Sequence, residues 1–211
     1  MTERESFEEL LTAMKTAAGA LNAAEVPFLL GGGLACWARG GPRTEHDVDF
    51  FVRPQDAEAA LAALARAGMR TERPPEQWLF KAWDSEILVD VIFEPSGRVV
   101  DEALFARADE MDVYAVRMHV ASLEDVLASK LLSLNEQNLD FGPPLEIARA
   151  LREQIHWPTV RELTRHSACA RAFLVLVEGL GIVAADGGAA NGSADVGLRQ
   201  DPHQPSRLGH R

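Results

Sequence analysis

The sequence has little of what marks exported, disulfide-bonded or membrane-spanning proteins. Its 211 residues include two cysteines, Cys36 and Cys169, which form no disulfide framework and lack the spacing of metal ligands. No apolar run approaches the roughly 18 residues of a membrane-spanning helix, and the first residues, MTERESFEELL, do not resemble a signal peptide. We therefore expect a cytoplasmic protein without membrane contact.

The chain is also poor in positive charge. Its 21 Lys and Arg residues are outnumbered by 32 Asp and Glu residues, which gives a formal net charge of −11. Duplex nucleic acid is bound chiefly through neutralisation of its phosphates, so this charge argues against a protein that grips nucleic acid with its whole surface. A local basic groove stays compatible with the charge, and a protein partner with a basic surface is favoured.

Apolar residues make up 47% of the chain, enough for a core of ordinary size. Strand-like runs occur only before about residue 120, whereas helical periodicity continues beyond it. Expected strands are residues 26–30, 47–52, 78–83, 86–94 and 112–120, and expected helices are residues 6–24, 34–40, 55–68, 123–134, 143–155, 159–167 and 168–181. The pattern predicts an α+β domain over residues 1–120, a C-terminal helical bundle over residues 121–183 and a disordered tail over residues 184–211.

Three glycines, Gly31, Gly32 and Gly33, follow the first expected strand. A phosphate-binding loop of the Walker type needs a lysine directly after its glycines, but the next lysine is Lys81. A dinucleotide-binding fingerprint needs a further spaced glycine that GGGLAC lacks. What remains is a tight turn between a strand and a helix, where free N–H groups can bind an anion or the two elements simply pack closely.

Asp47 and Asp49 lie two residues apart in the expected strand DVDFFV, so their side chains share one face and Val48 points to the core. Adjacent carboxylates repel each other, and Mg²⁺ removes this repulsion; a solvated strand edge is the alternative. Asp90, inside the apolar run EILVDVIFE, also needs a partner. If the two strands are neighbours, the three carboxylates can hold one or two Mg²⁺ ions, and Asp90 can accept a proton from an attacking hydroxyl.

In this order and spacing, Gly31-Gly32-Gly33, Asp47-Val48-Asp49 and Asp90 resemble the polymerase-β-like nucleotidyltransferase superfamily over residues 25–95. The family usually has Gly-Ser where this chain has Gly32-Gly33. The resemblance implies a mixed sheet flanked by helices and a transfer of NMP from an NTP, such as ATP, to a hydroxyl group. It also implies that the three aspartates bind Mg²⁺ and that the glycines hold the nucleotide phosphates.

The segment SLEDVLASKLLSL resembles the part that follows the catalytic sheet in bacterial nucleotidyltransferase toxins of the AbiE and MenAT type. This resemblance implies that Lys130 contacts nucleotide phosphate, that the 3′ end of tRNA is the acceptor and that an antitoxin is the protein partner. Lys130 borders the apolar face of its expected helix, so its stem can pack while its ammonium reaches a cleft. The acidic residue that these toxins carry shortly afterwards has candidates in Glu136 and Asp140.

Further candidates come from the residues alone. Arg43, in the loop before the D-x-D motif, is a candidate phosphate clamp or acceptor contact. Trp78 and Trp83 are candidates for stacking on a base, and arginines on the C-terminal helices would bind an RNA backbone if one face gathered them. A small-molecule acceptor, as in antibiotic nucleotidyltransferases, and a non-catalytic protein that binds nucleotide or a partner are the alternatives.

Overall fold

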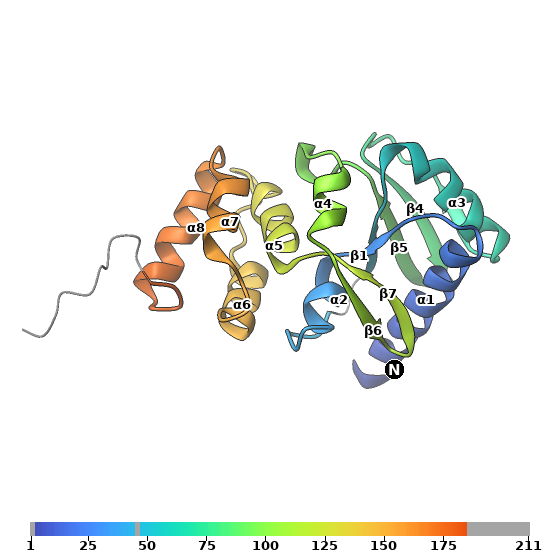
Figure 1. The fold of residues 1–211 in the computed structure, drawn as a ribbon, viewed down its shortest axis with the longest axis horizontal. Helices are drawn as coiled ribbons and strands as arrows, with labels where there is room; N and C mark the ends of the chain where they lie inside the picture. Colours follow the sequence, from blue (N-terminus) through green and yellow to red (C-terminus); the bar gives the residue numbers. More distant parts are fainter. Residues whose placement is uncertain (1–2, 45–46, 185–211) are drawn as a thin grey trace, which may run out of the picture.

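The computed structural model describes residues 3–44 and 47–184. Within these residues the strands form one seven-stranded mixed sheet in the order β3-β4-β5-β2-β1-β7-β6 (Figure 1). The strands are β1 Leu29–Leu30, β2 Asp47–Phe51, β3 Arg70–Glu72, β4 Leu79–Asp84, β5 Ile87–Ile92, β6 Asp109–Val113 and β7 Val116–Val120. A sheet of this kind with helices against it confirms the predicted α+β class.

The helices fall into two groups. Those that belong to the sheet part are α1 Glu3–Ala23, α2 Gly32–Trp37, α3 Ala57–Arg66 and α4 Glu102–Ala106, with short 3-10 helices η1 Pro54–Asp56 and η2 Pro95–Gly97. The second group follows the last strand and consists of α5 Leu123–Leu132, α6 Gly142–Leu151, α7 Trp157–Thr164 and α8 Ala168–Gly179. Helices α1 and α3 pack against the sheet, while α5 contacts α2 and joins α6, α7 and α8 (Figure 1).

Helix α1 shows why the sequence pattern predicts its position. Phe7, Leu10, Met14 and Leu21 recur at helical spacing and are all buried, because this face of α1 packs against strands β2, β5 and β7. None of the helices in the described part of the chain combines the length and the hydrophobicity that crossing a bilayer requires.

The centre of the sheet carries the feature that matters for function. Strands β2 and β5 are parallel neighbours, and Val48 pairs with Val89 while Asp49 pairs with Asp90. Val48 is fully buried, as expected for the core-facing residue of the D-V-D motif. The two acidic segments, forty residues apart in the sequence, are therefore adjacent in the sheet.

The structure departs from the sequence-based prediction at residues 112–120, which were expected to form one strand. Two antiparallel strands, β6 and β7, meet there at a turn in which Tyr114 and Ala115 have φ angles of 48° and 62°. Two successive left-handed residues match the twist of a two-residue hairpin, so the chain reverses even without glycine. The short elements β3 and α4 were also not predicted.

The C-terminal part conforms to expectation where it is described. Helix α5 begins after Ser122, whose hydroxyl accepts a hydrogen bond from the Asp125 N–H, as the S-x-x-D pattern predicts. The division of the chain at residue 120 stays a prediction. The predicted tail, residues 184–211, lies outside the described residues apart from Ala184.

Candidate functional site

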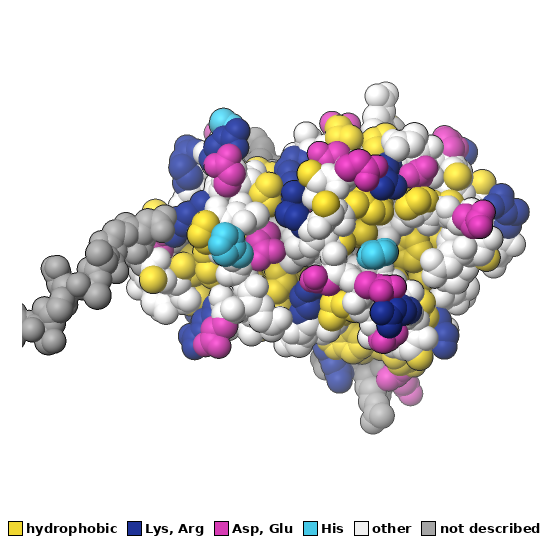
Figure 2. All heavy atoms as spheres, in the orientation of Figure 1, with side chains coloured by type: hydrophobic (Ala, Val, Ile, Leu, Met, Phe, Trp, Pro, Cys, Tyr) yellow, Lys and Arg dark blue, Asp and Glu magenta, His cyan; other side chains and the backbone are white. Residues whose placement is uncertain are grey.

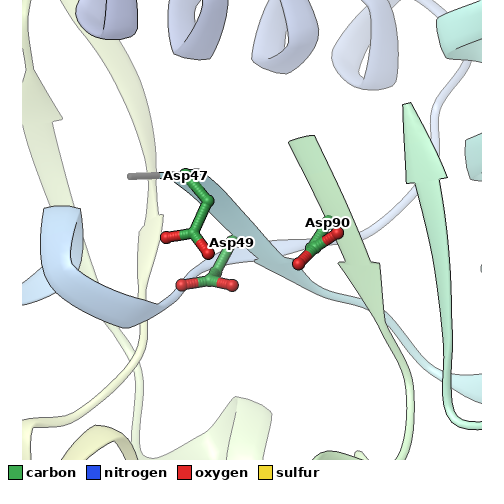
Figure 3. A group of neighbouring side chains, drawn as sticks. All are labelled: Asp47, Asp49 and Asp90. Atoms are coloured by element: carbon green, nitrogen blue, oxygen red, sulfur yellow. The ribbon is translucent and has the colours of Figure 1, made fainter. Parts of the chain in front are cut away.

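Asp47, Asp49 and Asp90 form a compact group of carboxylates. One carboxylate oxygen from each residue can be chosen so that all three lie within 4.8 Å of one another. Figure 3 shows the three side chains gathered on one face of the sheet, two from β2 and one from β5. Their proximity follows from the parallel register of the two strands, which pairs Asp49 with Asp90. The predicted association of Asp90 with the D-x-D motif is therefore present.

The charges of this group are poorly balanced by the protein itself. Burial, followed by repulsion from Asp47, raises the pKa of Asp49 to about 7, while Lys130 opposes the shift. Burial also raises the pKa of Asp90, against the lowering effect of Lys81. Three converging carboxylates, two of them with raised pKa values, are a suitable set of hard oxygen ligands for a divalent cation. The residues present therefore fit a magnesium-type site.

Lys81 is a site residue that the sequence analysis did not identify. Its ammonium lies 3.4 Å from Asp90 Oδ1, and the two residues face each other across β4 and β5. The expected hairpin contains the information needed to predict this pair, because Lys81 and Asp90 are equally far from the turn that follows Asp84. Counting outward from that turn would have paired them. Lys81 offsets part of the charge of Asp90.

The glycine turn lies directly against the carboxylates. Gly31 N–H donates a hydrogen bond of 2.8 Å to the Asp49 carbonyl oxygen. Gly32 has a φ angle of +53°, and a Cβ atom there would lie 1.6 Å from Asp49 Oδ2. At Gly33 a Cβ would lie 2.5 Å from the Thr44 Cβ. Glycine is therefore required at position 32 for the close approach of the turn to Asp49 and at position 33 for its approach to Thr44. A role of these glycines in holding phosphate stays a prediction.

Lys130 lies at the junction of two hollows in the surface. The first, of about 260 Å³, is lined by Gly32, the three aspartates and Lys130, and is called the carboxylate groove below. Lys130 is half-buried on α5, beside the buried Leu127 and Leu131. The charge of Lys130 lowers the pKa of Asp49. Lys130 is therefore gathered with the predicted metal ligands.

Arg43 lies in the second hollow rather than in the carboxylate groove. This hollow, of about 280 Å³, is lined by Gly33, Arg43 and Lys130 among others. The exposed Arg43 guanidinium lies 5.1 Å from the centre of the Phe7 ring, which gives it a cation–π contact. The structure thus brings Arg43 together with Gly33 and Lys130, on the side of the groove next to α2.

Most of the remaining candidates lie away from this site. Asp140 is exposed and accepts a hydrogen bond of 2.8 Å from the Gly142 N–H. Among the C-terminal arginines, Arg161 pairs with Glu178 and Arg165 with Glu162. On the face shown in Figure 2, positive and negative side chains lie side by side over these helices. Of the two tryptophans, Trp78 lines the carboxylate groove, whereas the Trp83 ring packs under the guanidinium of Arg70, 3.8 Å away.

A buried charge network holds the helix of Lys130 in place. Asp125 is fully buried and accepts hydrogen bonds from Arg107 at 2.7 and 2.8 Å, from Arg98 at 3.0 Å and from the Ser122 hydroxyl at 2.9 Å. Burial alone would raise the pKa of Asp125, but these donors outweigh it and leave the pKa below its usual value. The network joins the first turn of α5 to the segment between β5 and β6.

Comparisons with known proteins agree with the fold. A family model described as "Nucleotidyl transferase of unknown function (DUF2204)" matches residues 10–155. The chain is similar in structure to the antibiotic-resistance factor ANT(2'')-Ia, with a TM-score of 0.54 and 16% identity over 81% of this chain and 96% of that one. It is also similar to an antigenic nucleotidyltransferase-like protein from Paracoccidioides brasiliensis, with a TM-score of 0.51 and 12% identity over 82% and 88% of the two chains. Curated protein sequences gave no match. At these identities the two structures establish the fold alone.

Proposed function

The chain belongs to the nucleotidyl transferase family described as DUF2204, and on this premise we propose that it transfers a nucleoside monophosphate from a nucleoside triphosphate to a hydroxyl group of an acceptor. The observation that carries the proposal is the group of three carboxylates on one face of the sheet, with a glycine turn and Lys130 at its edge. Family membership supports the type of reaction, and the geometry supports the roles assigned below.

In this proposal Asp47, Asp49 and Asp90 hold Mg²⁺, for which carboxylate oxygens are suitable ligands. Bound Mg²⁺ supplies positive charge at the phosphate oxygens and favours loss of the proton from the acceptor hydroxyl. Gly31, Gly32 and Gly33 let the phosphates approach the backbone, because no side chain covers the N–H groups of the turn. The absence of a side chain at Gly32 also leaves room for the Asp49 carboxylate.

The cations next to the glycine turn bind the triphosphate. Lys130 lines both the carboxylate groove and the hollow of Arg43, so its ammonium neutralises phosphate charge at the junction of the two. Asp90 accepts the proton of the acceptor hydroxyl, whose oxygen forms a bond to the α-phosphorus. The bond between the α-phosphorus and the bridging oxygen breaks, and pyrophosphate leaves. The raised pKa of Asp90 favours this proton transfer.

Two classes of acceptor fit this chemistry. The assignment of the 3′ end of tRNA as acceptor, with an antitoxin as protein partner, rests on the resemblance of the α5 segment to nucleotidyltransferase toxins. A small molecule with a free hydroxyl group rests on the fold that the chain has in common with an antibiotic-resistance factor. The pairing of Arg161 and Arg165 with glutamates weakens the case for an RNA backbone on the C-terminal helices.

The experiment is a transfer assay with the purified protein. The protein is incubated with Mg²⁺ and the four NTPs, and pyrophosphate release is measured with total tRNA or with aminoglycosides as acceptors. We expect release by the wild type and a loss of at least about 100-fold in Asp49→Asn and Asp90→Asn. Asp84→Asn, at the far end of the same hairpin, is the matched control and should retain the activity. Equal rates in all four proteins, or no release with any acceptor, would contradict the proposal.

A further inference from the structure

The carboxylate groove continues past Asp90 into a neighbouring hollow that none of the assigned roles uses. This hollow, of about 570 Å³, is lined by Gln77, Trp78, Glu94, Ser96, Gly97 and Ser133 and is called the Trp78 hollow below. Three of its residues, Trp78, Ser96 and Ser133, also line the carboxylate groove. The two hollows are therefore adjacent, and a ligand in the Trp78 hollow can extend into the carboxylate groove.

Trp78 presents an aromatic surface to the hollow from a fixed position. Its side chain is 40% exposed and does not belong to the buried core. Its backbone is held firmly, because the Trp78 carbonyl accepts hydrogen bonds from the N–H groups of Phe93 at 3.0 Å and Glu94 at 3.2 Å. A large apolar ring that is exposed at an anchored position is a typical ligand contact.

Glu94 makes the hollow negative. Glu94 is half-buried, and its carboxylate has no hydrogen-bond or ion-pair partner within residues 3–44 and 47–184. The residues that line the hollow include no Lys or Arg in the described part of the chain. A carboxylate without a partner in the protein can form a charge-assisted hydrogen bond with a cationic group of a ligand. An aromatic face beside it attracts the same kind of group.

The positions of the charges also divide the site into two ends. Gly33, Arg43 and Lys130 gather on the α2 side, where positive charge suits a triphosphate. The Trp78 hollow lies at the other end, because strand order places β4 and Trp78 beyond β5 and away from β2. Lys130 on α5 lines the hollow of Arg43, and Ser133, which directly follows the end of α5, lines the Trp78 hollow. Asp90 lies between the two ends.

We propose that the Trp78 hollow is the acceptor subsite and that the acceptor is a small hydroxylated molecule with a protonated amine, which Trp78 and Glu94 bind. This inference rests on the proposed nucleotidyl transfer and names its acceptor class. The amine lies against the Trp78 ring and the Glu94 carboxylate, and a hydroxyl group of the same molecule faces Asp90. That hydroxyl oxygen forms the new bond to the α-phosphorus, its proton goes to Asp90, and pyrophosphate leaves. A polyanionic strand such as RNA is repelled by Glu94.

The test compares two probes that have the same hydroxyl groups but differ in the charge of their nitrogen atoms. Kanamycin carries several amines and hydroxyl groups, and its fully N-acetylated form keeps the hydroxyl groups but loses the positive charges. With an α-labelled NTP mixture, we expect the wild type to label kanamycin, with kcat/KM lowered at least about 10-fold by N-acetylation. Glu94→Gln should reduce this discrimination, and Trp78→Ala should raise KM for kanamycin about 10-fold without changing KM for the NTP.

The controls separate this inference from the proposed function. Tyr114→Ala removes another aromatic residue with 40% exposure, far from the hollow, and should leave both KM values unchanged. Trp78→Phe keeps an aromatic ring and serves as the second variant if Trp78→Ala does not fold. Its KM for kanamycin should lie between those of the wild type and the alanine variant. Labelling of tRNA in preference to kanamycin, or discrimination unchanged in Glu94→Gln, would overturn the acceptor subsite. Pyrophosphate release that depends on Asp49 but labels neither acceptor would also overturn it, while cleavage between the α- and β-phosphates at the carboxylates would stand.

Discussion

Replacement of Asp49 by asparagine tests the electrostatics of the site, because protons and metal ions compete for the same carboxylate. The pKa of Asp49 is raised to about 7 by burial, by repulsion from Asp47 and by the charge of Asp90. Below this value the folded protein holds a proton at Asp49, and a cation must displace it. Metal affinity should therefore fall as pH decreases through about 7 and should approach a plateau above it.

The magnitude follows from the fraction of Asp49 that is ionised. With a pKa of about 7 this fraction is about one eleventh at pH 6 and about ten elevenths at pH 8, so the apparent affinity for Mg²⁺ or Mn²⁺ should rise about 10-fold between them. The raised pKa of Asp90 adds to the effect in the same direction. Isothermal titration calorimetry at both pH values, in buffers of different ionisation enthalpy, measures the affinity and the protons released.

Two variants complete this measurement. Asp49→Asn should bind metal more weakly and should show a smaller pH dependence, since the titrating carboxyl is gone. Asp84→Asn should behave as the wild type. Equal affinity of the wild type at pH 6 and pH 8, with no proton release, would refute the reasoning that Asp49 has a raised pKa and is a metal ligand.

Three further predictions concern the structure around the carboxylates. Lys130→Ala should raise KM for the NTP about 10- to 100-fold because a charged phosphate contact is lost, while Lys130→Arg should restore part of it; steady-state kinetics with varied NTP measures this. Gly32→Ala should weaken metal binding in calorimetry, because the new Cβ would lie 1.6 Å from Asp49 Oδ2. The control is Gly40→Ala, where φ is +86° and a Cβ would meet nothing within 4 Å. This control should lower the free energy of unfolding by only about 1–2 kcal/mol and should keep the metal affinity. Asp125→Ala leaves two arginines without their buried partner and should lower the free energy of unfolding by about 3–5 kcal/mol in urea denaturation; a change below about 1 kcal/mol would mean that the network is not a stabilising element.

The local order of the site could be predicted from the sequence because the decisive patterns are short. The D-x-D motif has the two-residue spacing that places Asp47 and Asp49 on one face, and Val48 is buried as expected. Asp90 stands out in the sequence because a charge is unusual inside an apolar run. The pairing of their strands could only be stated as a condition, since register between β2 and β5 depends on contacts far apart in the sequence.

Other features could not be predicted for a physical reason. The turn at Tyr114 and Ala115 lacks the glycine or asparagine that usually marks a hairpin, so the run around it looks like one strand. The network of Asp125 joins Arg98 and Arg107 to a helix that the sequence shows only as a capping pattern. The Trp78 hollow depends on the packing of α5 and η2 beside the sheet, which no local pattern encodes.

The central claim, transfer of a nucleoside monophosphate to an acceptor, is tested most directly by following the α- and γ-phosphates of the NTP. The protein is incubated with Mg²⁺, kanamycin or tRNA, and NTPs labelled either at the α- or at the γ-phosphate, and the label on the acceptor is counted. Nucleotidyl transfer predicts that the α label appears on the acceptor, that the γ label leaves with pyrophosphate, and that Asp90→Asn loses both signals. Transfer of the γ label to the acceptor, or α-label transfer that survives in Asp90→Asn, would contradict the account.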